Sequence, residues 1–149
     1  MPTNTKPVIT NLGAEEAAAI VQEWHDHPDT ITTPSGCWIA KRTSADYKKI
    51  HCQELNGNVS QYQLHVIAWA AANNKDPPTG MDISHLCHEN YCFFSGHLVA
   101  ESSTLNNRRK RCYGSRYCPL HKNIVVHLCD HNPRCVISKA TDKCSCHVI

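Results

Sequence analysis

The chain has 149 residues and a formal charge of +2 at neutral pH, with 41% apolar residues but only two Phe, three Trp and five Tyr. The length fits one domain, and so few large apolar side chains exclude an extensive hydrophobic core, so disulfides or metal ions must help to hold the fold. Ten Cys beside eleven His favour metal, because zinc sites combine thiolate and imidazole whereas disulfide scaffolds need no histidine.

The N-terminus contains no apolar run of signal-peptide length, and no later segment approaches the roughly 20 apolar residues of a membrane span. We therefore expect an intracellular protein in a reducing compartment. A zinc ion held by three thiolates and one imidazole carries one negative charge, so two such sites would bring the net charge near zero. Net charge then gives no argument for nucleic acid, and local clusters must carry it.

In the N-terminal third, residues 1–13 read as an irregular arm rich in Thr, Pro and Asn. The segment 14–24 combines strong helix formers with acidic residues in its first turn, which predicts a short helix. After a loop marked by Pro and Gly, residues 37–40 (Cys-Trp-Ile-Ala) indicate a short strand.

The middle of the chain predicts a hairpin followed by a buried helix. Strand-like segments at 46–53 and 59–63 flank the turn signal Asn56-Gly57. Residues 64–72 are apolar enough for a largely buried helix, which should stop before Pro77-Pro78.

From Asp82 onward, metal-ligand residues are dense and apolar periodicity nearly vanishes, which is typical of a loop-rich part held by metal. Ser102 and Ser103 are suited to cap a short helix over 104–111. The last stretch, 138–149, is polar except at its end and is suited to dock on a partner.

Cys87, Cys92 and His97 follow one another at intervals of five residues, which suits a loop wrapped around a tetrahedral ion. The fourth ligand must come from upstream, where Cys37 and Cys52 are the candidates. Cys37 is favoured because it begins a strand behind a glycine, whereas Cys52 lies inside a hairpin strand.

A second group has the spacing C-x-H-x₃-C and consists of Cys129, His131 and Cys135. Cys112, at the end of the short helix, would complete it, and Cys118 with His121 is the rival pair. The tail residues Cys144, Cys146 and His147 are interpreted as unliganded.

His85 and Asn106 beside the first loop suit metal-assisted phosphodiester hydrolysis. A neutral imidazole can take a proton from water, and an amide oxygen together with phosphate oxygens can hold a hard cation such as Mg²⁺. The ordinary alternatives are a spectator histidine and a surface asparagine.

The run from Ser84 to Cys135 resembles the His-Cys box homing endonucleases, the intron-encoded branch of the ββα-metal nucleases. The similarity lies in the order S-H-L-C-H-x₃-C-x₄-H-L, then E-S, an Asn, a basic pair, a Cys and C-x-H-x₃-C. It extends more weakly upstream, to a Cys before a hairpin with an Asn-Gly turn and to the N-terminal helix.

The resemblance implies an α+β fold, a small zinc-stabilised ββα-metal nuclease with antiparallel hairpins, short helices and long metal-held loops. The whole chain, 1–149, would be one endonuclease domain. Its parts would be the arm 1–13, a hairpin and catalytic core at 37–112, a second zinc loop at 112–135 and the tail 138–149.

The implied activity is Mg²⁺-dependent, sequence-specific double-strand cleavage of DNA by an intron-homing enzyme, with His85 as general base and Asn106 as ligand of the single Mg²⁺. Two structural Zn²⁺ per chain are implied. The first would be held by Cys37, Cys87, Cys92 and His97, and the second by Cys112, Cys129, His131 and Cys135. Because one chain has one catalytic site, a homodimer is expected, with the tail as a candidate for exchange between subunits.

Two departures from the family pattern stand out. The family has an arginine on the second hairpin strand at the scissile phosphate, and residues 59–63 contain none. The possible substitutes are Arg42, Lys48, Lys49 and Arg109; without a substitute, the chain would be a weakened or inactive DNA-binding module. The other departure is a long gap of 16 residues between Cys112 and Cys129.

In this family the hairpin sheet lies in the major groove, where Gln and Asn pair with adenine and Lys pairs with guanine or phosphate. A basic run at 108–111 would lie near the cut phosphates and is also compatible with nuclear import. The expected DNA contacts are Lys48, Lys49, Gln53, Asn58, Gln61, Gln63, Arg108 and Arg109.

Overall fold

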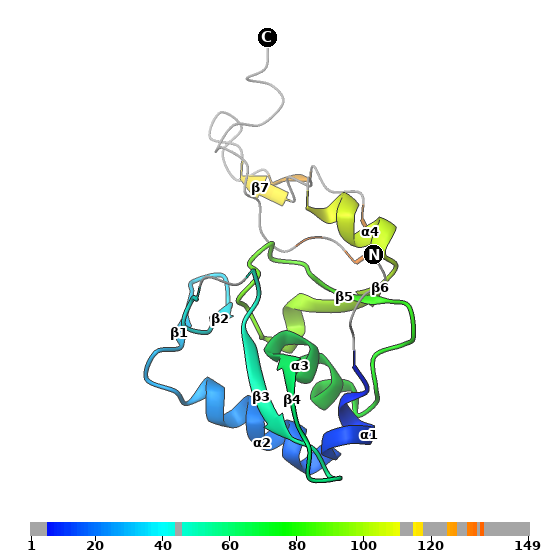
Figure 1. Ribbon diagram of the computed structural model, residues 1–149. Helices are drawn as coiled ribbons and strands as arrows, with labels where there is room; N and C mark the ends of the chain where they lie inside the picture. The colour runs from blue at the N-terminus through cyan, green and yellow to red at the C-terminus, as the bar shows by residue number, and fades with distance from the viewer. Residues whose placement is uncertain are drawn as a thin grey trace.

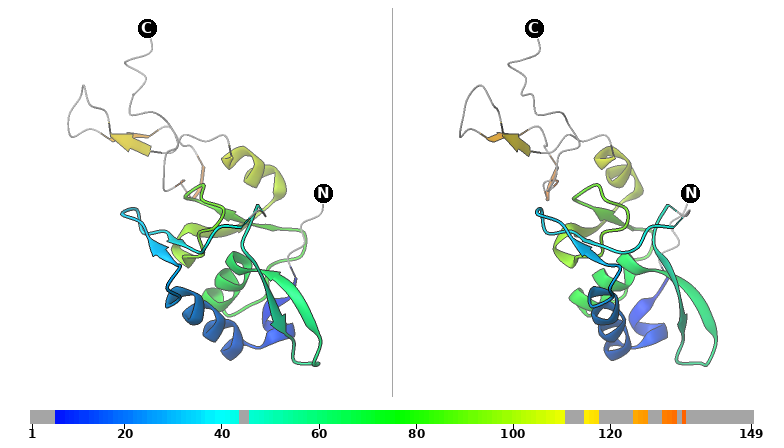
Figure 2. Two further views of the ribbon diagram at one scale, coloured as in Figure 1. Left: turned by 60° about the vertical axis from the view of Figure 1, so that its left-hand side comes forward. Right: turned by 90° about the vertical axis from the view of Figure 1, so that its left-hand side faces the viewer.

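The computed structural model describes residues 6–43, 46–110, 115–117, 125–127, 131–133 and 135. Within these residues the fold is a small α+β arrangement of short helices and two-stranded antiparallel sheets, as the sequence predicts. In each view of Figures 1 and 2, helices α2 (Ala14–His25) and α4 (Ser103–Arg109) lie toward opposite ends with α3 (Leu64–Asn73) between them. No helix in the described ranges has the length and apolar character needed to cross a membrane.

Two helices begin the chain, where the sequence predicts an arm and one helix. The helix α2 is confirmed, but residues Val8–Leu12 form a further short helix, α1, so the prediction of an irregular arm is wrong there. The reason is a distant cap: Asp76 accepts hydrogen bonds from the backbone N–H of Ile9 at 2.5 Å and of Thr10 at 3.2 Å. These satisfy amides at the start of α1 that no local side chain serves.

The hairpin formed by β3 (Lys49–Gln53) and β4 (Val59–Gln63) turns at Asn56-Gly57, as predicted. Gly57 has φ +91°, which glycine adopts without the strain that a side chain would bring. Alternate residues face the interior, so Ile50, Cys52 and Tyr62 are buried.

Directly after β4, helix α3 buries every residue from Leu64 to Ala70. It packs against α1 and α2 and contributes more buried residues to the apolar core than any other described element; the core also takes in Phe93 and Leu98. A helix buried on all sides needs neighbours on all sides, so α3 is the element around which the others are arranged.

Two further hairpins complete the described architecture around the metal-ligand residues. Strands β1 (Ile31–Thr32) and β2 (Trp38–Ile39) pair, and so do β5 (Asp82–His85) and β6 (Leu98–Glu101), with the 3₁₀ turn η1 (Ser95–His97) just before β6. The β5–β6 pairing was not anticipated, because four-residue strands separated by a long loop leave little periodicity.

The helix α4 follows β6 and packs on β5. Its N-cap is Ser102, whose side chain accepts from the N–H of Leu105 at 3.3 Å, in agreement with the predicted capping. Strands β7 (Ser115–Tyr117) and β8 (Val125–His127) form a last antiparallel pair.

Candidate functional site

Three cysteines and one histidine gather beside the loop that joins β5 to β6. The sulfurs of Cys37, Cys87 and Cys92 and a ring nitrogen of His97 lie within 4.8 Å of one another, and all four residues are buried. Nδ1 of His97 is 3.5 Å from the sulfur of Cys37 and 3.7 Å from that of Cys92. In tetrahedral zinc sites, sulfur and nitrogen ligands stand roughly 3.5 Å apart, so this donor set fits one zinc ion.

Backbone contacts bring Cys37 to the loop. The N–H of Phe93 donates to Trp38 at 2.9 Å and that of Ala40 donates to Tyr91 at 3.3 Å, which fastens β2 to the loop that carries Cys92. Gly36, at φ +92°, turns the chain just before Cys37, with the His97 ring 3.8 Å from the position where a Cβ would stand.

The structure places Cys37, and not Cys52, with the other three ligands. Cys52 packs in the apolar core of the hairpin, where burial raises the pKa of its thiol. Cys37, Cys52, Cys87 and Cys92 are all free cysteines in the structure.

Within the cluster, Cys87 and Cys92 are joined by a hydrogen bond that shifts the pKa of both thiols. A hydrogen bond from Cys87 lowers the pKa of Cys92 to about 6, and the same contact raises the pKa of Cys87 far above that of an ordinary thiol. A buried thiolate of this kind is the form that binds zinc.

Half of the second predicted ligand set can be placed. The sulfur of Cys135 lies 3.9 Å from Nδ1 of His131, which is compatible with two ligands of one ion. Cys112 and Cys129 lie outside the described residues, as do the rivals Cys118 and His121 and the tail residues Cys144, Cys146 and His147.

His85 and Asn106, the two residues singled out for chemistry, line one pocket of about 160 Å³. They come from different elements, His85 from the end of β5 and Asn106 from α4. The other residues that line the pocket are Tyr47, His88, Asn90, Arg109 and Lys110. An imidazole and a side-chain amide thus line a common space large enough for a water molecule and a cation.

The imidazole of His85 is held in one tautomer. Its Nε2 lies 3.1 Å from the carbonyl oxygen of Cys92, and since a carbonyl only accepts, Nε2 carries the proton. Nδ1 is therefore the basic nitrogen. Burial lowers the pKa of His85 to about 4, so the ring is neutral at pH 7.

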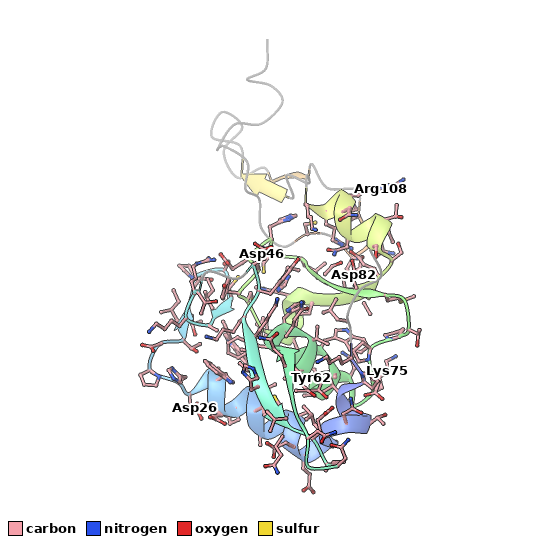
Figure 3. The ribbon with its side chains drawn as sticks, in the orientation of Figure 1. Asp26, Asp46, Tyr62, Lys75, Asp82 and Arg108 are labelled. Atoms are coloured by element: carbon pink, nitrogen blue, oxygen red, sulfur yellow. The ribbon has the colours of Figure 1, made fainter. Side chains whose placement is uncertain are left out.

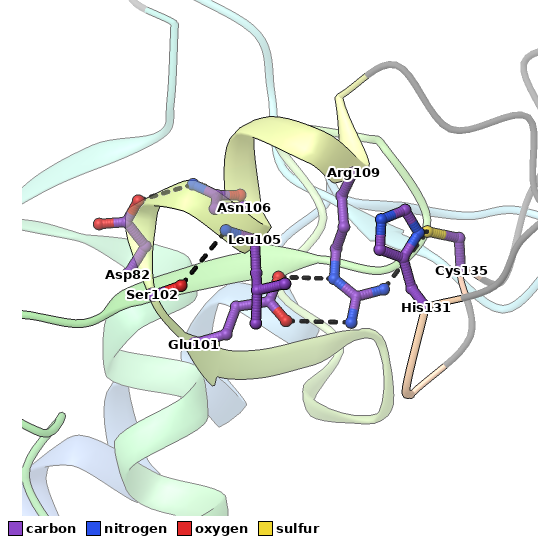
Figure 4. A network of polar contacts seen from close by, with 8 residues as sticks. All are labelled: Asp82, Glu101, Ser102, Leu105, Asn106, Arg109, His131 and Cys135. Carbon is purple, nitrogen blue, oxygen red and sulfur yellow. Dashed lines mark hydrogen bonds and ion pairs between the residues drawn. The ribbon is translucent and has the colours of Figure 1, made fainter.

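Asn106 is oriented by a residue that the sequence did not single out. Its side-chain Nδ2 donates to Oδ2 of Asp82, at the start of β5, at 2.8 Å (Figure 4). The only sequence signal for Asp82 is an acidic residue three positions before His85, which is too common to be informative alone.

The prediction that Arg109 contacts DNA is corrected by the structure, because the side chain is buried. Its side chain is 2% exposed, and its Nε and Nη2 donate to the carboxylate of Glu101 at 2.5 and 3.0 Å. Its Nη1 also donates to the sulfur of Cys135 at 3.4 Å (Figure 4). The physical reason is the acidic Glu101 at the end of β6, which draws the guanidinium inward from α4. Arg108, its neighbour, is exposed (Figure 3).

The hairpin presents a polar face to solvent. In register, Lys49 stands opposite Gln63, His51 opposite Gln61, and Gln53 opposite Val59. All of these except the half-buried Gln63 are exposed, as is Asn58 in the turn. His51 was missed, although the alternation of β3 places it between Lys49 and Gln53.

Lys48 is different from Lys49, because it is half-buried with its ammonium 4.8 Å from the ring centre of Trp24. Both lysines line a groove of about 410 Å³ between α2 and β3, together with Glu16 and Glu23. The mixed charge of this groove does not mark it as a phosphate site.

The fold and the cysteine–histidine cluster together fit a small α+β protein that a zinc ion stabilises. A family model described as the zinc-binding loop region of homing endonuclease matches residues 36–145. The chain therefore belongs to this family, whose membership supports a nuclease-related function and DNA as the partner. No curated protein and no solved structure gives a significant match.

Proposed function

We propose that the protein is a Mg²⁺-dependent, sequence-specific DNA endonuclease that makes double-strand breaks, encoded by an intron and acting in its homing. The observation that carries the proposal is the pocket shared by His85 and Asn106. One residue offers a neutral base and the other offers an amide oxygen, which are the two groups that hydrolysis of a phosphodiester with one cation requires.

In the proposed reaction, Nδ1 of His85 takes a proton from a water molecule, and the water oxygen attacks phosphorus as the bond to the 3′ oxygen breaks. The hydrogen bond from Nε2 to Cys92 keeps Nδ1 free to accept that proton. Asn106 would hold the Mg²⁺, which when bound stabilises negative charge on the departing oxygen. The zinc ions, two per chain, would be structural.

The partner would be double-stranded DNA, read by the exposed hairpin residues Lys49, Gln53, Asn58 and Gln61, with Arg108 on the phosphates. One catalytic pocket per chain implies a homodimer for double-strand cleavage. The basic residues that begin at Arg108 would also direct the protein to the nucleus.

A second candidate is a zinc-stabilised DNA-binding module that has lost most of its activity. It is favoured by the absence of arginine from β4 and by the burial of Arg109, which removes one of the possible substitutes. Arg42 is engaged too, since it pairs with Glu89 at 2.5 Å, but its side chain is 57% exposed and could still reach a phosphate.

A plasmid library with random inserts separates the two candidates. Incubated with Mg²⁺ and sequenced at the cut ends, it should show cleavage at one family of related sites. His85→Ala should lower the single-turnover rate by roughly 10²- to 10⁴-fold with zinc content and DNA affinity unchanged. The control is His27→Ala, because His27 is half-buried and does not line the pocket. Binding of selected sites without any cleavage by the unaltered protein would exclude the endonuclease and favour the module.

A further inference from the structure

Asp82 links the two elements that carry the proposed chemistry. It begins β5, three residues before His85, and pairs in register with Glu101 at the end of β6, from which α4 continues. Its carboxylate reaches α4 through the hydrogen bond with Asn106, 24 residues away in the chain. Figure 3 shows Asp82 directly beneath α4.

The contact fixes which way the Asn106 amide faces. An ionised carboxylate only accepts hydrogen bonds, so the atom of Asn106 that faces Oδ2 of Asp82 must be the NH₂ group. The amide oxygen then lies on the other side, turned away from Asp82 (Figure 4). The opposite rotamer would set an oxygen against an oxygen and lose the bond.

Two observations argue that this carboxylate does more than fasten α4. Its other oxygen, Oδ1, is enclosed and has no hydrogen-bond partner in the part of the chain that the structure describes, which costs stability rather than adding it. The charge of Asp82 also reaches the pocket. Tyr47, one of the lining residues, has its pKa raised by burial and then by the charges of Asp46 and Asp82.

We propose that Asp82 is a positioning residue that holds the Asn106 amide with its oxygen toward the divalent cation. The inference rests on the proposed function, because it takes Asn106 as the cation ligand. A hard cation binds the amide oxygen and not the NH₂ group, so an amide free to turn over would be competent for only part of the time.

The orientation is tested without any divalent cation, by the NMR signals of the Asn106 side-chain NH₂ in the zinc-loaded protein, assigned by their loss in Asn106→Ala. We expect one downfield proton that exchanges slowly with water. In Asp82→Ala the downfield shift and the protection should disappear, whereas Asp82→Asn should keep part of both because its oxygen can still accept. Asp46→Ala is the matched control, because Asp46 is an exposed aspartate next to Tyr47, the pocket residue whose pKa Asp82 also raises. Identical Asn106 signals in the unaltered protein and in Asp82→Ala would overturn the proposal.

The consequence is tested by the Mg²⁺ concentration that gives half-maximal cleavage. Asp82→Ala should raise it by about tenfold, as loss of a residue that orients a metal ligand does. The rate at saturating Mg²⁺ and the zinc content should change little, and in the Asn106→Ala background Asp82→Ala should add nothing. If the unaltered protein cleaves and Asp82→Ala has the same Mg²⁺ requirement, this proposal is wrong while the proposed function stands. If the unaltered protein does not cleave, the proposed function is wrong, and the NMR result still decides the orientation of the amide.

Discussion

Nε2 of His85 lies 3.1 Å from the carbonyl oxygen of Cys92, whose sulfur belongs to the cysteine–histidine cluster. One residue therefore has two contacts: its side chain belongs to the candidate zinc site, and its backbone holds the candidate base. The imidazole keeps its position only as long as the loop around Cys92 does. Zinc binding and the proposed catalysis should thus be coupled, although the zinc ion would have no part in the proposed chemistry.

The first prediction follows from this coupling. Cys37→Ser should lower the zinc content by one ion per chain, because a candidate zinc ligand is lost, and should reduce cleavage strongly. The loss of cleavage would be indirect, since Cys37 does not line the pocket of His85 and Asn106. Native mass spectrometry gives the zinc count, and single-turnover cleavage gives the rate.

Cys52→Ser is the matched control for this change, since Cys52 is equally buried but packs in the apolar core. It should keep the full zinc content, with some loss of stability because a hydroxyl replaces a thiol among apolar neighbours. Full zinc and full activity in Cys37→Ser would contradict the assignment.

The ligand cluster was accessible to sequence reasoning because most of its information is local. The even spacing of Cys87, Cys92 and His97 predicts a loop around an ion, and only the fourth residue, Cys37, comes from a distant part of the sequence. The hairpin and helices α2 and α3 were likewise predicted, since each has a local signal: an Asn-Gly turn, strong helix formers with acidic residues in the first turn, and a long apolar run, respectively.

The features that could not be predicted from the sequence depend on single contacts between residues that are far apart in the chain. Helix α1 depends on Asp76, about 67 positions away, and the orientation of Asn106 depends on Asp82. The burial of Arg109 depends on Glu101, which looks in the sequence like any acidic residue before a helix. Such pairs leave no periodic signal, so a basic run on α4 reads as uniformly exposed when one of its members is buried.

The second prediction concerns the exposed face of the β3–β4 hairpin. Gln61→Ala should relax base preference at one position of the DNA site, at a cost of about 1–3 kcal/mol for the preferred base, because a glutamine can pair with adenine through two hydrogen bonds. The measurement is competitive binding of a library varied at single positions.

Gln22→Ala offers a matched control for this change, since Gln22 is an exposed glutamine on α2 whose side chain bonds to Asp26. It should leave both affinity and base preference unchanged. If Gln61→Ala lowers affinity equally for every base at every position, Gln61 is not a base contact.

The third prediction compares two adjacent arginines of α4. Arg109→Met leaves Glu101 buried without its partner and should lower the free energy of unfolding by about 3–5 kcal/mol. The double variant Arg109→Met with Glu101→Leu should recover much of this loss, because an apolar pair can replace a buried ion pair. Urea unfolding of the zinc-loaded protein measures both.

Exposed Arg108 should behave in the opposite way. Arg108→Ala should change stability by no more than about 0.5 kcal/mol. It should lower DNA affinity equally for all sequences and should reduce the slope of log affinity against log salt by about 0.9. A large loss of stability from Arg108→Ala, or none from Arg109→Met, would show that the burial of these two residues has been assigned wrongly.

The last prediction is a pH dependence that comes from His65. This histidine lies on α3, buried, with the rings of His85 and Tyr47 packed at 4.5 and 5.2 Å between centres. Burial, with a smaller effect of His85, lowers the pKa of His65 well below 6.5, against a weaker opposing contact with the Ile83 backbone.

As the pH falls below 6.5, the unfolded chain takes up a proton at residue 65 that the folded protein does not, so the free energy of unfolding falls by up to about 1.4 kcal/mol per pH unit. That loss continues until the pH reaches the lowered pKa. His65→Leu should therefore make the curve of stability against pH less steep below 6.5, whatever it does to stability at pH 7; the lowered pKa of His85 would still contribute to the remaining slope. Urea unfolding at pH 7, 6 and 5 with zinc content checked at each pH is the measurement, and parallel curves for the unaltered protein and His65→Leu would mean that His65 is charged in the folded state.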